Sequence, residues 1–313
     1  MALRDYLVGE VAEDFVDGLL TRREALRRLG LLGLGASSAG LLLAACAGTA
    51  PSGTAPSAAP PTPNAAAPSA ALPGGEPPGR GPGVSRGSEI RFAGPAGELR
   101  GAWAAPAAGQ AKGALLVVHE NRGLTAHFYD LVGRFAGAGY GALCVDLLSA
   151  QGGTAALTDP AQVPTALANA PATDLLADLR AGMDELGKRV PGTKLGGVGF
   201  CFGGGMIWQL LNAGDTRLAA AVPFYGPAPE NPNFTRAKAA VLAVYGALDA
   251  RVDATIPRAE AALRAAGLPY QVRVFDGADH AFFNDTGQRY QPDAARTAWS
   301  ETLDWFGKYL AAG

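Results

Sequence analysis

Cysteine and histidine are scarce in this chain, with three of each among 313 residues. Three cysteines cannot form the dense disulfide framework that stabilises small secreted scaffolds. Charge is nearly balanced, at a formal −2, and no basic stripe follows the first thirty residues, which argues against a nucleic-acid partner. The sequence also lacks a strongly apolar run of about 20 residues, the length that a membrane-spanning helix needs.

The first 46 residues have the pattern of an export signal. A twin arginine, Arg22-Arg23, precedes an apolar run from Leu29 to Leu43 that small residues interrupt. Paired arginines ahead of such a run indicate the twin-arginine export route. The segment Leu43-Ala44-Ala45-Cys46 at the end of this run resembles the lipobox of bacterial lipoproteins, which are cut before a cysteine that then carries lipid. We expect an exported, lipid-anchored protein in the periplasm or on the outer face of a membrane. The alternative is an ordinary secretory signal cut near Ala45, with no role for Cys46.

Residues 47–87 have the composition of a linker. Within them, residues 50–75 contain neither a charged nor an aromatic side chain and are rich in proline, alanine, glycine and serine. Such a segment cannot bury enough apolar surface to offset its chain entropy. We expect a tether between residues 1–46 and a folded domain at residues 88–313. A low-complexity insert without a spacing role is the alternative.

From residue 88 onward, apolar segments of strand length alternate with segments of helical periodicity. Two short segments near Glu89 and Glu98 indicate a hairpin, and the later strands are apolar throughout. This pattern favours an α/β fold with a mostly parallel sheet covered by helices on both faces. Ligands of such sheets bind at the carboxyl ends of the strands. The candidate residues at predicted strand ends are Glu120, Asp146, Cys201, Tyr225, Asp249 and His280.

The segment from Gly199 to Gly203 has the glycine spacing of a nucleophile elbow, with Cys201 in the place of the nucleophile. Glycines let the strand and the next helix pack closely around such a strained turn. The helix N-terminus favours a thiolate, and the backbone N–H of Phe202 can face an oxyanion. The alternative is a glycine-rich bend without chemistry, because many strand–helix units contain one.

In an α/β hydrolase, an acid after a later strand and a histidine in a late loop follow the elbow. Asp249 and His280 occupy those places. The alternative role of Asp249 is a helix N-cap, although Asp253 is better placed for it. The alternative for His280 is an ordinary surface-loop histidine. His119 and His127 form no spaced ligand pair with carboxylates, so we expect no metal site.

Five short segments occur in the order VVHENRGL, VDLLS, GFCFGG, GALD and DHAFFNDT. In this order they resemble the dienelactone hydrolase family of α/β hydrolases, over about residues 88–310. The resemblance implies hydrolysis of a small carboxylic ester or lactone without a cofactor. It implies that Cys201 is the nucleophile, His280 the general base and acid, and Asp249 the residue that orients His280. It further implies that Glu120 contacts the resting thiol and takes part in its activation. The backbone N–H groups of Phe202 and Asn121 would be the oxyanion donors.

The sequence departs from the family where dienelactone-cleaving members hold the substrate carboxylate with two arginines. Ala150 and Asn284 stand at about the matching places. Arginine is hard to replace in bidentate carboxylate recognition, so we expect a substrate other than dienelactone. Arg122 is a candidate substrate contact, and equally a surface residue or an ion-pair partner. Tyr225 and Phe282 are candidates for an apolar pocket wall, and equally for ordinary core.

Two other functions stay open at this point. One is a tethered ligand-binding module that keeps the fold without turnover, against which the order of the candidate catalytic residues argues. The other is a redox-sensitive thiol, for which no resolving cysteine is evident because Cys144 lies in an apolar strand. The expected partner is a small molecule, and the sequence leaves its acyl and alcohol parts, and the oligomeric state, undetermined.

Overall fold

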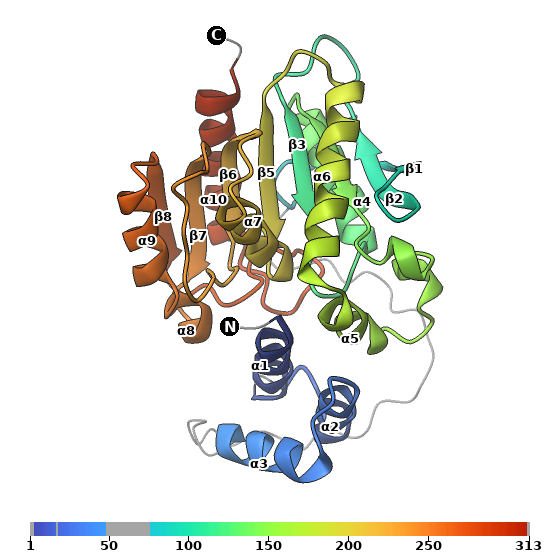
Figure 1. The fold of residues 1–313 in the computed structure, drawn as a ribbon, viewed down its shortest axis with the longest axis vertical. Helices are drawn as coiled ribbons and strands as arrows, with labels where there is room; N and C mark the ends of the chain where they lie inside the picture. Colours follow the sequence, from blue (N-terminus) through green and yellow to red (C-terminus); the bar gives the residue numbers. More distant parts are fainter. Residues whose placement is uncertain (1–2, 17, 48–75, 312–313) are drawn as a thin grey trace. The chain divides into compact units, whose positions relative to one another are not determined.

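The computed structural model describes residues 3–16, 18–47 and 76–311. They fall into two compact units, one within residues 2–75 and one that begins at Glu76 (Figure 1). Of the segment expected to be a linker, residues 48–75 lie outside the described residues. Residues 76–87 belong to the second unit.

In its described part, the first unit consists of helices that contact one another, namely α1 (Leu3–Val16), α2 (Arg22–Leu31) and α3 (Ala36–Ala47). The twin arginine begins α2, and Thr21 caps that helix by accepting a hydrogen bond from the Glu24 backbone N–H at 3.3 Å. The apolar run is divided between α2 and α3, and Gly33, with φ 82°, lies in the break. Among the described residues, no helix is both long and apolar enough to cross a membrane.

The second unit is built on an eight-stranded sheet with the order β1-β2-β4-β3-β5-β6-β7-β8. The strands are β1 (Ser88–Ala93), β2 (Glu98–Ala104), β3 (Ala114–Val118), β4 (Gly141–Val145), β5 (Leu195–Phe200), β6 (Leu218–Phe224), β7 (Ala240–Gly246) and β8 (Tyr270–Phe275). β1 and β2 form the predicted hairpin, and β2 pairs antiparallel with β4. The other pairs are parallel, which confirms the expected mostly parallel sheet.

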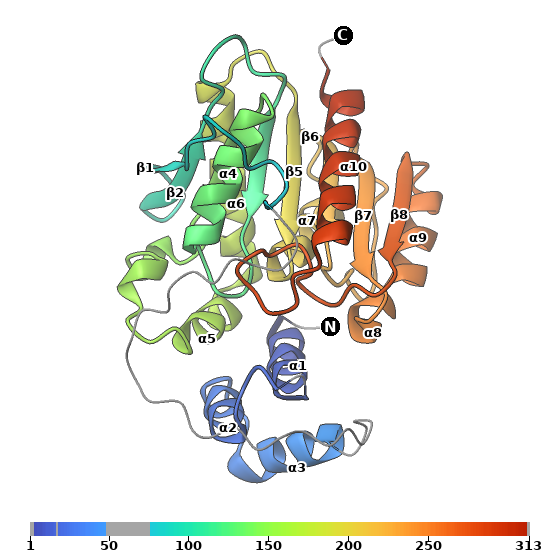
Figure 2. The ribbon, with the colours of Figure 1, turned by 180° about the vertical axis from the view of Figure 1, so that it is seen from behind.

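Helices cover both faces of this sheet. The helices of this unit are α4 (Ala126–Gly137), α5 (Gln162–Asn169), α6 (Ala172–Arg189), α7 (Phe202–Asn212), α8 (Ala250–Asp253), α9 (Ile256–Ala265) and α10 (Pro292–Leu310), with short 3-10 turns at Ser149–Gln151 and Thr154–Ala156. α6 and α7 lie in front of the sheet in Figure 1, and α4 and α10 cover the opposite face in Figure 2. β3 and β4 are buried along their whole length, as their unbroken apolar sequences predict.

Residues 76–87 form a strap along α4. Gly87 donates its backbone N–H to the carbonyl of Tyr129 at 2.7 Å, and Arg86 Nη2 donates to the carbonyl of Ala126 at 2.8 Å. A Cβ on Gly87 would lie 2.3 Å from Val132 Cγ2, so the close approach requires glycine. The folded unit therefore begins before the first strand.

Candidate active site

Cys201 lies at a sharp turn between β5 and α7. Its backbone has φ 56° and ψ −119°, a conformation that is strained for a residue with a Cβ. The Cys201 N–H donates to the Phe224 carbonyl of β6 at 3.0 Å, and the Gly205 N–H donates to the Cys201 carbonyl at 3.0 Å. The surrounding backbone holds the strained conformation in place, as in a nucleophile elbow.

The glycines around Cys201 are sterically required. A Cβ on Gly199 would lie 2.1 Å from the Gly203 carbonyl oxygen, and a Cβ on Gly203 would lie 2.2 Å from the Val118 carbonyl oxygen. Neither residue can carry a side chain without moving the backbone, so the start of α7 packs directly against β3 and β5. The glycine spacing seen in the sequence therefore has the expected steric origin.

The two expected oxyanion donors are Phe202, which follows Cys201, and Asn121, which follows the neighbouring strand β3. Phe202 is the first residue of α7, so its backbone N–H is one of the first four, which have no carbonyl partner inside the helix. Val118 pairs with Gly199, so the segment after β3, which contains Asn121, lies beside the segment after β5. The positive end of the α7 dipole favours a thiolate or an oxyanion at this edge of the sheet.

His280 and Asp249 form a buried hydrogen-bonded pair. His280 Nδ1 lies 2.5 Å from Asp249 Oδ2. The other oxygen, Oδ1, accepts a hydrogen bond from the Val252 backbone N–H at 3.2 Å. Because both Asp249 oxygens are held, the imidazole ring of His280 keeps one orientation. A ring nitrogen of His280 lies within 4.8 Å of Cys201 Sγ.

Asp249 is also the N-cap of α8, a role for which the sequence favoured Asp253. That expectation is wrong, because α8 begins directly after Asp249 and ends at Asp253. Burial, together with the negative charge of Asp249, raises the pKa of Asp253 to about 6. The two contacts of Asp249 are compatible because they use different oxygens of one carboxylate.

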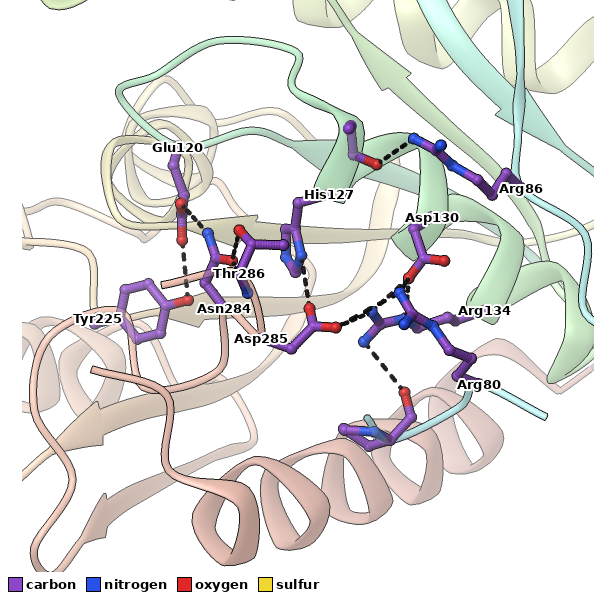
Figure 3. A network of polar contacts seen from close by, with 12 residues as sticks. Arg80, Arg86, Glu120, His127, Asp130, Arg134, Tyr225, Asn284, Asp285 and Thr286 are labelled. Atoms are coloured by element: carbon purple, nitrogen blue, oxygen red, sulfur yellow. Dashed lines mark hydrogen bonds and ion pairs between the residues drawn. The ribbon is translucent and has the colours of Figure 1, made fainter. Parts of the chain in front are cut away.

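Glu120 is a buried carboxylate held by two uncharged donors (Figure 3). Asn284 Nδ2 donates to Glu120 Oε2 at 2.7 Å, and the Tyr225 hydroxyl donates to Glu120 Oε1 at 3.3 Å. Glu120 follows β3, the strand next to β5, which carries the elbow. The carboxylate is therefore fixed from two sides at the same edge of the sheet as Cys201.

Tyr225 follows β6 in an unusual backbone conformation, with φ 36°. Its N–H donates to the Val244 carbonyl at 2.7 Å, and its ring centroid lies 5.1 Å from that of His280. Burial, and then the negative charges of Glu120 and Cys201, raise the pKa of Tyr225 well above its usual value. The hydroxyl therefore stays protonated and serves as a donor to Glu120.

The two remaining candidate substrate contacts lie in different surroundings. Phe282 is fully buried in an aromatic cluster, with ring centroids 5.4 Å from Phe275 and 5.7 Å from Tyr225. Arg122 is exposed in the turn after β3. The structure thus brings Tyr225 to Glu120 and His280, whereas Phe282 packs within the core and Arg122 lies at the surface.

His119 and Asp146 support the ends of neighbouring strands. His119 Nδ1 lies 2.8 Å from the Glu120 carbonyl oxygen, and its Nε2 accepts a hydrogen bond from the Leu147 N–H at 3.2 Å. Burial lowers the pKa of His119, which favours a neutral ring with its proton on Nδ1. The Asp146 carboxylate accepts hydrogen bonds from the Thr154 N–H at 2.7 Å and hydroxyl at 2.8 Å. These contacts fix the turns on which the site is built.

Sequence reasoning missed what Asn284 and Asp285 do. Asn284 was noted only as the place of an absent arginine, whereas its amide binds Glu120. Asp285 is buried against Arg134 and His127 of α4. The closeness of both residues to His280 along the chain was the available signal. Their partners, however, lie far away along the chain. Glu120 follows β3, and Arg134 of α4 is 151 residues from Asp285.

Relatives of the chain are found among curated proteins. The sequence model of the dienelactone hydrolase family matches residues 99–310. A candidate carboxymethylenebutenolidase of Methylorubrum extorquens is 34% identical over 224 residues, which cover 67% of this chain and 76% of that protein. A protein of Salmonella typhimurium with the same description is 32% identical over 218 residues, covering 62% and 77% of the two chains.

Solved structures show the same relationship. The crystal structure of a candidate dienelactone hydrolase from Klebsiella pneumoniae matches with a TM-score of 0.64 at 29% identity, over 71% of this chain and 98% of that one. A dienelactone hydrolase from Anabaena variabilis shares the fold, with a TM-score of 0.55 at 19% identity over 72% and 100%. This chain therefore belongs to the dienelactone hydrolase family and has an α/β-hydrolase fold.

Proposed function

We propose that this protein hydrolyses a small carboxylic ester or lactone, with Cys201 as nucleophile, His280 as general base and acid, and Asp249 as the group that orients His280. The position of His280 carries the proposal. It is hydrogen-bonded to Asp249 and has a ring nitrogen within 4.8 Å of Cys201 Sγ. A nucleophile on a strained elbow, a base and an orienting acid make up the hydrolytic triad of this fold.

Acylation begins when Cys201 Sγ gives its proton to His280 Nε2, since Nδ1 is held by Asp249. The thiolate attacks the carbonyl carbon, a C–S bond forms, and the carbonyl electrons move onto oxygen. The N–H groups of Phe202 and Asn121 stabilise this oxyanion, and one such donor is typically worth about 10²–10³-fold in rate. The C–O bond to the alcohol then breaks, and the imidazolium protonates the departing oxygen, leaving a thioester.

Deacylation repeats these steps with water. His280 takes a proton from water, and the oxygen attacks the thioester carbonyl. The C–S bond breaks, and the Cys201 thiolate recovers the proton from the imidazolium, which releases the carboxylic acid. The ionised Asp249 stabilises the imidazolium in both halves and keeps the ring in the tautomer that presents Nε2 to Cys201. Every step uses groups of this chain and water.

Glu120 is proposed to contact the resting thiol and to take part in its activation. The support is its burial beside the elbow and its fixed orientation, with one oxygen on Asn284 and the other on Tyr225. Both donors are neutral, so the Glu120 charge is not cancelled by either of them. A carboxylate in this place acts directly on the protonation of the neighbouring thiol.

We further propose that the substrate is uncharged near its carbonyl group. Ala150 and Asn284 replace the two arginines expected for carboxylate recognition, and the Asn284 amide is already committed to Glu120. A substrate carboxylate near Glu120 would meet repulsion between like charges. Arg122, which is exposed, is the remaining candidate cation. Neutral esters are therefore expected to give a higher kcat/KM than matched esters that carry a carboxylate.

An internal disulfide at Cys201 would require a second reactive thiol. Cys144 lies fully buried in β4, and burial raises its pKa well above the usual value, so it supplies little thiolate. A binding module without turnover would have no need of the Asp249–His280 pair. The Asp249–His280 pair therefore favours the hydrolase.

Export by the twin-arginine route and lipid attachment at Cys46 also remain proposals, supported by the sequence around Arg22-Arg23 and by residues 43–46. Replacing both arginines by lysine should retain the protein in the cytoplasm, as followed by cell fractionation. The mass of the mature N-terminus should correspond to a chain that begins at an acylated Cys46. Export unaffected by the lysines, or a mature chain that begins elsewhere, would contradict these proposals.

The hydrolase is tested with a panel of short-chain esters and lactones under reducing conditions. The full chain is compared with Cys201→Ala and with Cys144→Ala as the matched control, since both cysteines are buried. We expect turnover in the wild type and the control, and its loss in Cys201→Ala. Turnover that survives in Cys201→Ala would overturn the assignment of the nucleophile.

A further inference from the structure

A buried ion cluster lies next to the segment that follows His280 (Figure 3). Its centre is Asp285, whose side chain is 2% exposed. Asp285 Oδ2 accepts a hydrogen bond from Arg134 Nη2 at 2.6 Å, and Asp285 Oδ1 lies 2.9 Å from His127 Nδ1. Both partners belong to α4, so this helix holds the segment from one side.

The charges of this cluster are compensated within it. Arg134 is fully buried and pairs with both Asp285 and Asp130. Arg80 of the strap adds a second guanidinium, 2.8 Å from Asp130 and 3.6 Å from Asp285. Burial acts to raise the pKa of Asp285, but contact with His127 and the charge of Arg134 outweigh it and lower the pKa to about 2. Removing one member would leave a buried charge without its partner.

The residue before Asp285 is the one that binds Glu120. Asn284 Oδ1 accepts hydrogen bonds from the Thr286 N–H at 3.0 Å and from the Thr286 hydroxyl at 2.6 Å. Because an amide has its acceptor and its donors on opposite sides, these bonds orient Nδ2 toward Glu120 Oε2, at 2.7 Å. The reversed amide would place Asn284 Oδ1 against Glu120 Oε2, and two acceptors cannot share a hydrogen bond. The hydrogen bond to Glu120 therefore requires the observed position of Asn284 and Thr286.

We propose that Asp285 is a positioning residue for the Glu120 carboxylate. Its ion pairs to Arg134 and His127 fix the segment after His280 where the Asn284 amide meets Glu120. Asp285 acts through Asn284, and the chain of contacts runs from α4 to the edge of the sheet beside Cys201. The inference rests on the proposed function, in which Glu120 stands next to the reacting thiol.

A double-mutant cycle on the full chain tests this coupling, with Asp285→Asn, Asn284→Ala and the double variant. The readouts are kcat and KM for a neutral ester, and the pH profile of Cys201 alkylation by iodoacetamide followed by peptide mass spectrometry. We expect each single substitution to lower kcat roughly 10- to 100-fold with little change in KM. Both substitutions should shift the midpoint of the pH profile of Cys201 alkylation in the same direction. In the double variant, the effect of Asp285→Asn should largely disappear, because its route through Asn284 is gone.

Asp215 provides a matched control. It is a buried aspartate paired with Arg180 at 3.1 Å and Arg217 at 2.7 Å, but it precedes β6 at the opposite, amino end of the strands. Asp215→Asn should lower the melting temperature and leave kcat and the alkylation profile unchanged. His127→Gln serves as a second, milder variant if Asp285→Asn does not fold, because it leaves the Arg134 pair in place. Its effect should have the same direction as that of Asp285→Asn and a smaller size.

Additive effects in the cycle would overturn the inference. So would an Asp285→Asn or a His127→Gln protein that loses stability but keeps the wild-type kcat and alkylation profile. Alkylation does not require turnover, so the two proposals fail separately. A wild-type protein without esterase activity counts against the proposed function, while the alkylation cycle still decides whether Asp285 acts on the thiol through Asn284.

Discussion

The second unit contains two buried aspartate–histidine pairs that differ in their contacts and surroundings. His280 Nδ1 lies 2.5 Å from Asp249, and His127 Nδ1 lies 2.9 Å from Asp285. The second oxygen of Asp249 accepts a backbone N–H, whereas that of Asp285 accepts a guanidinium N–H of Arg134. The third partner therefore distinguishes the pairs.

That partner decides what each histidine can do. Arg134 neutralises Asp285 permanently, so this pair serves as an anchor whatever the protonation of the ring. Asp249 has no such guanidinium among its described contacts, so its charge is available to stabilise an imidazolium. His280 also lies near a thiol, while His127 packs edge-on against the Phe128 ring at 5.1 Å. Under the proposed function, one aspartate–histidine pair takes part in catalysis, whereas the other holds the segment after His280.

Substituting the two histidines should give the largest difference in kcat between the two aspartate–histidine pairs. His280→Gln removes the proposed base and should lower kcat by about 10⁴-fold or more. His127→Gln leaves the base in place and should lower kcat by less than about tenfold, since the Arg134–Asp285 pair remains. Initial rates with one neutral ester measure both. Equal losses of kcat in His280→Gln and His127→Gln would contradict the different roles assigned to the two pairs.

Substituting the two aspartates should give crossed effects. Asp249→Asn should lower kcat by about 10⁴-fold because the ring loses its orienting acid, yet asparagine keeps the cap of α8 and much of the stability. Asp285→Asn should cost about 3 kcal/mol of stability because the buried Arg134 loses one of its two carboxylate partners and keeps Asp130. Urea unfolding and kcat are measured on both variants. An Asp249→Asn protein that remains active would contradict the proposed triad.

Acid should weaken the anchor pair. The pKa of Asp285 is about 2 in the folded protein, below the value of about 3.9 in an unfolded chain. A depressed carboxyl pKa contributes stability above the unfolded value, and that contribution is lost as pH falls toward 2. The depressed pKa therefore corresponds to about 3 kcal/mol of stability near neutral pH. The stability difference between wild type and Asp285→Asn should shrink between about pH 5 and pH 3, and a constant difference would count against this assignment.

The strap should make the smallest contribution. Arg80 is 42% exposed and pairs with Asp130 at the edge of the cluster. Exposed ion pairs contribute at most about 1 kcal/mol, and salt screens them. Arg80→Ala should therefore lower stability slightly at low salt, with less effect at high salt, and leave kcat unchanged. A large loss of kcat would show that the strap takes part in positioning the site.

The sequence predicted the sheet and the candidate triad because both depend on local patterns. Apolar strands mark the sheet, and strand ends bring Cys201, Asp249 and His280 to one edge whatever the details of packing. The glycines on either side of Cys201 report the tight turn directly, because a side chain there would meet backbone atoms.

The contacts that hold the site depend on distant residues and were not predictable in this way. Asp285 meets Arg134 from far along the chain, and the choice between Asp249 and Asp253 as a cap depends on where a four-residue helix begins. Residues 76–87 are rich in proline and glycine like the segment that precedes them. Their docking on α4 depends on partners that Arg80, Arg86 and Gly87 find there.

The central claim is that Cys201 carries the acyl group, and its direct test is the mass of the enzyme during turnover. The protein is mixed with 4-nitrophenyl acetate, quenched in acid at short times and mapped by peptide mass spectrometry. We predict an acetyl group on the Cys201 peptide that forms and decays as fast as the ester is hydrolysed and is absent from Cys201→Ala. Hydrolysis without acetylation of Cys201, or at an undiminished rate in Cys201→Ala, would contradict the account.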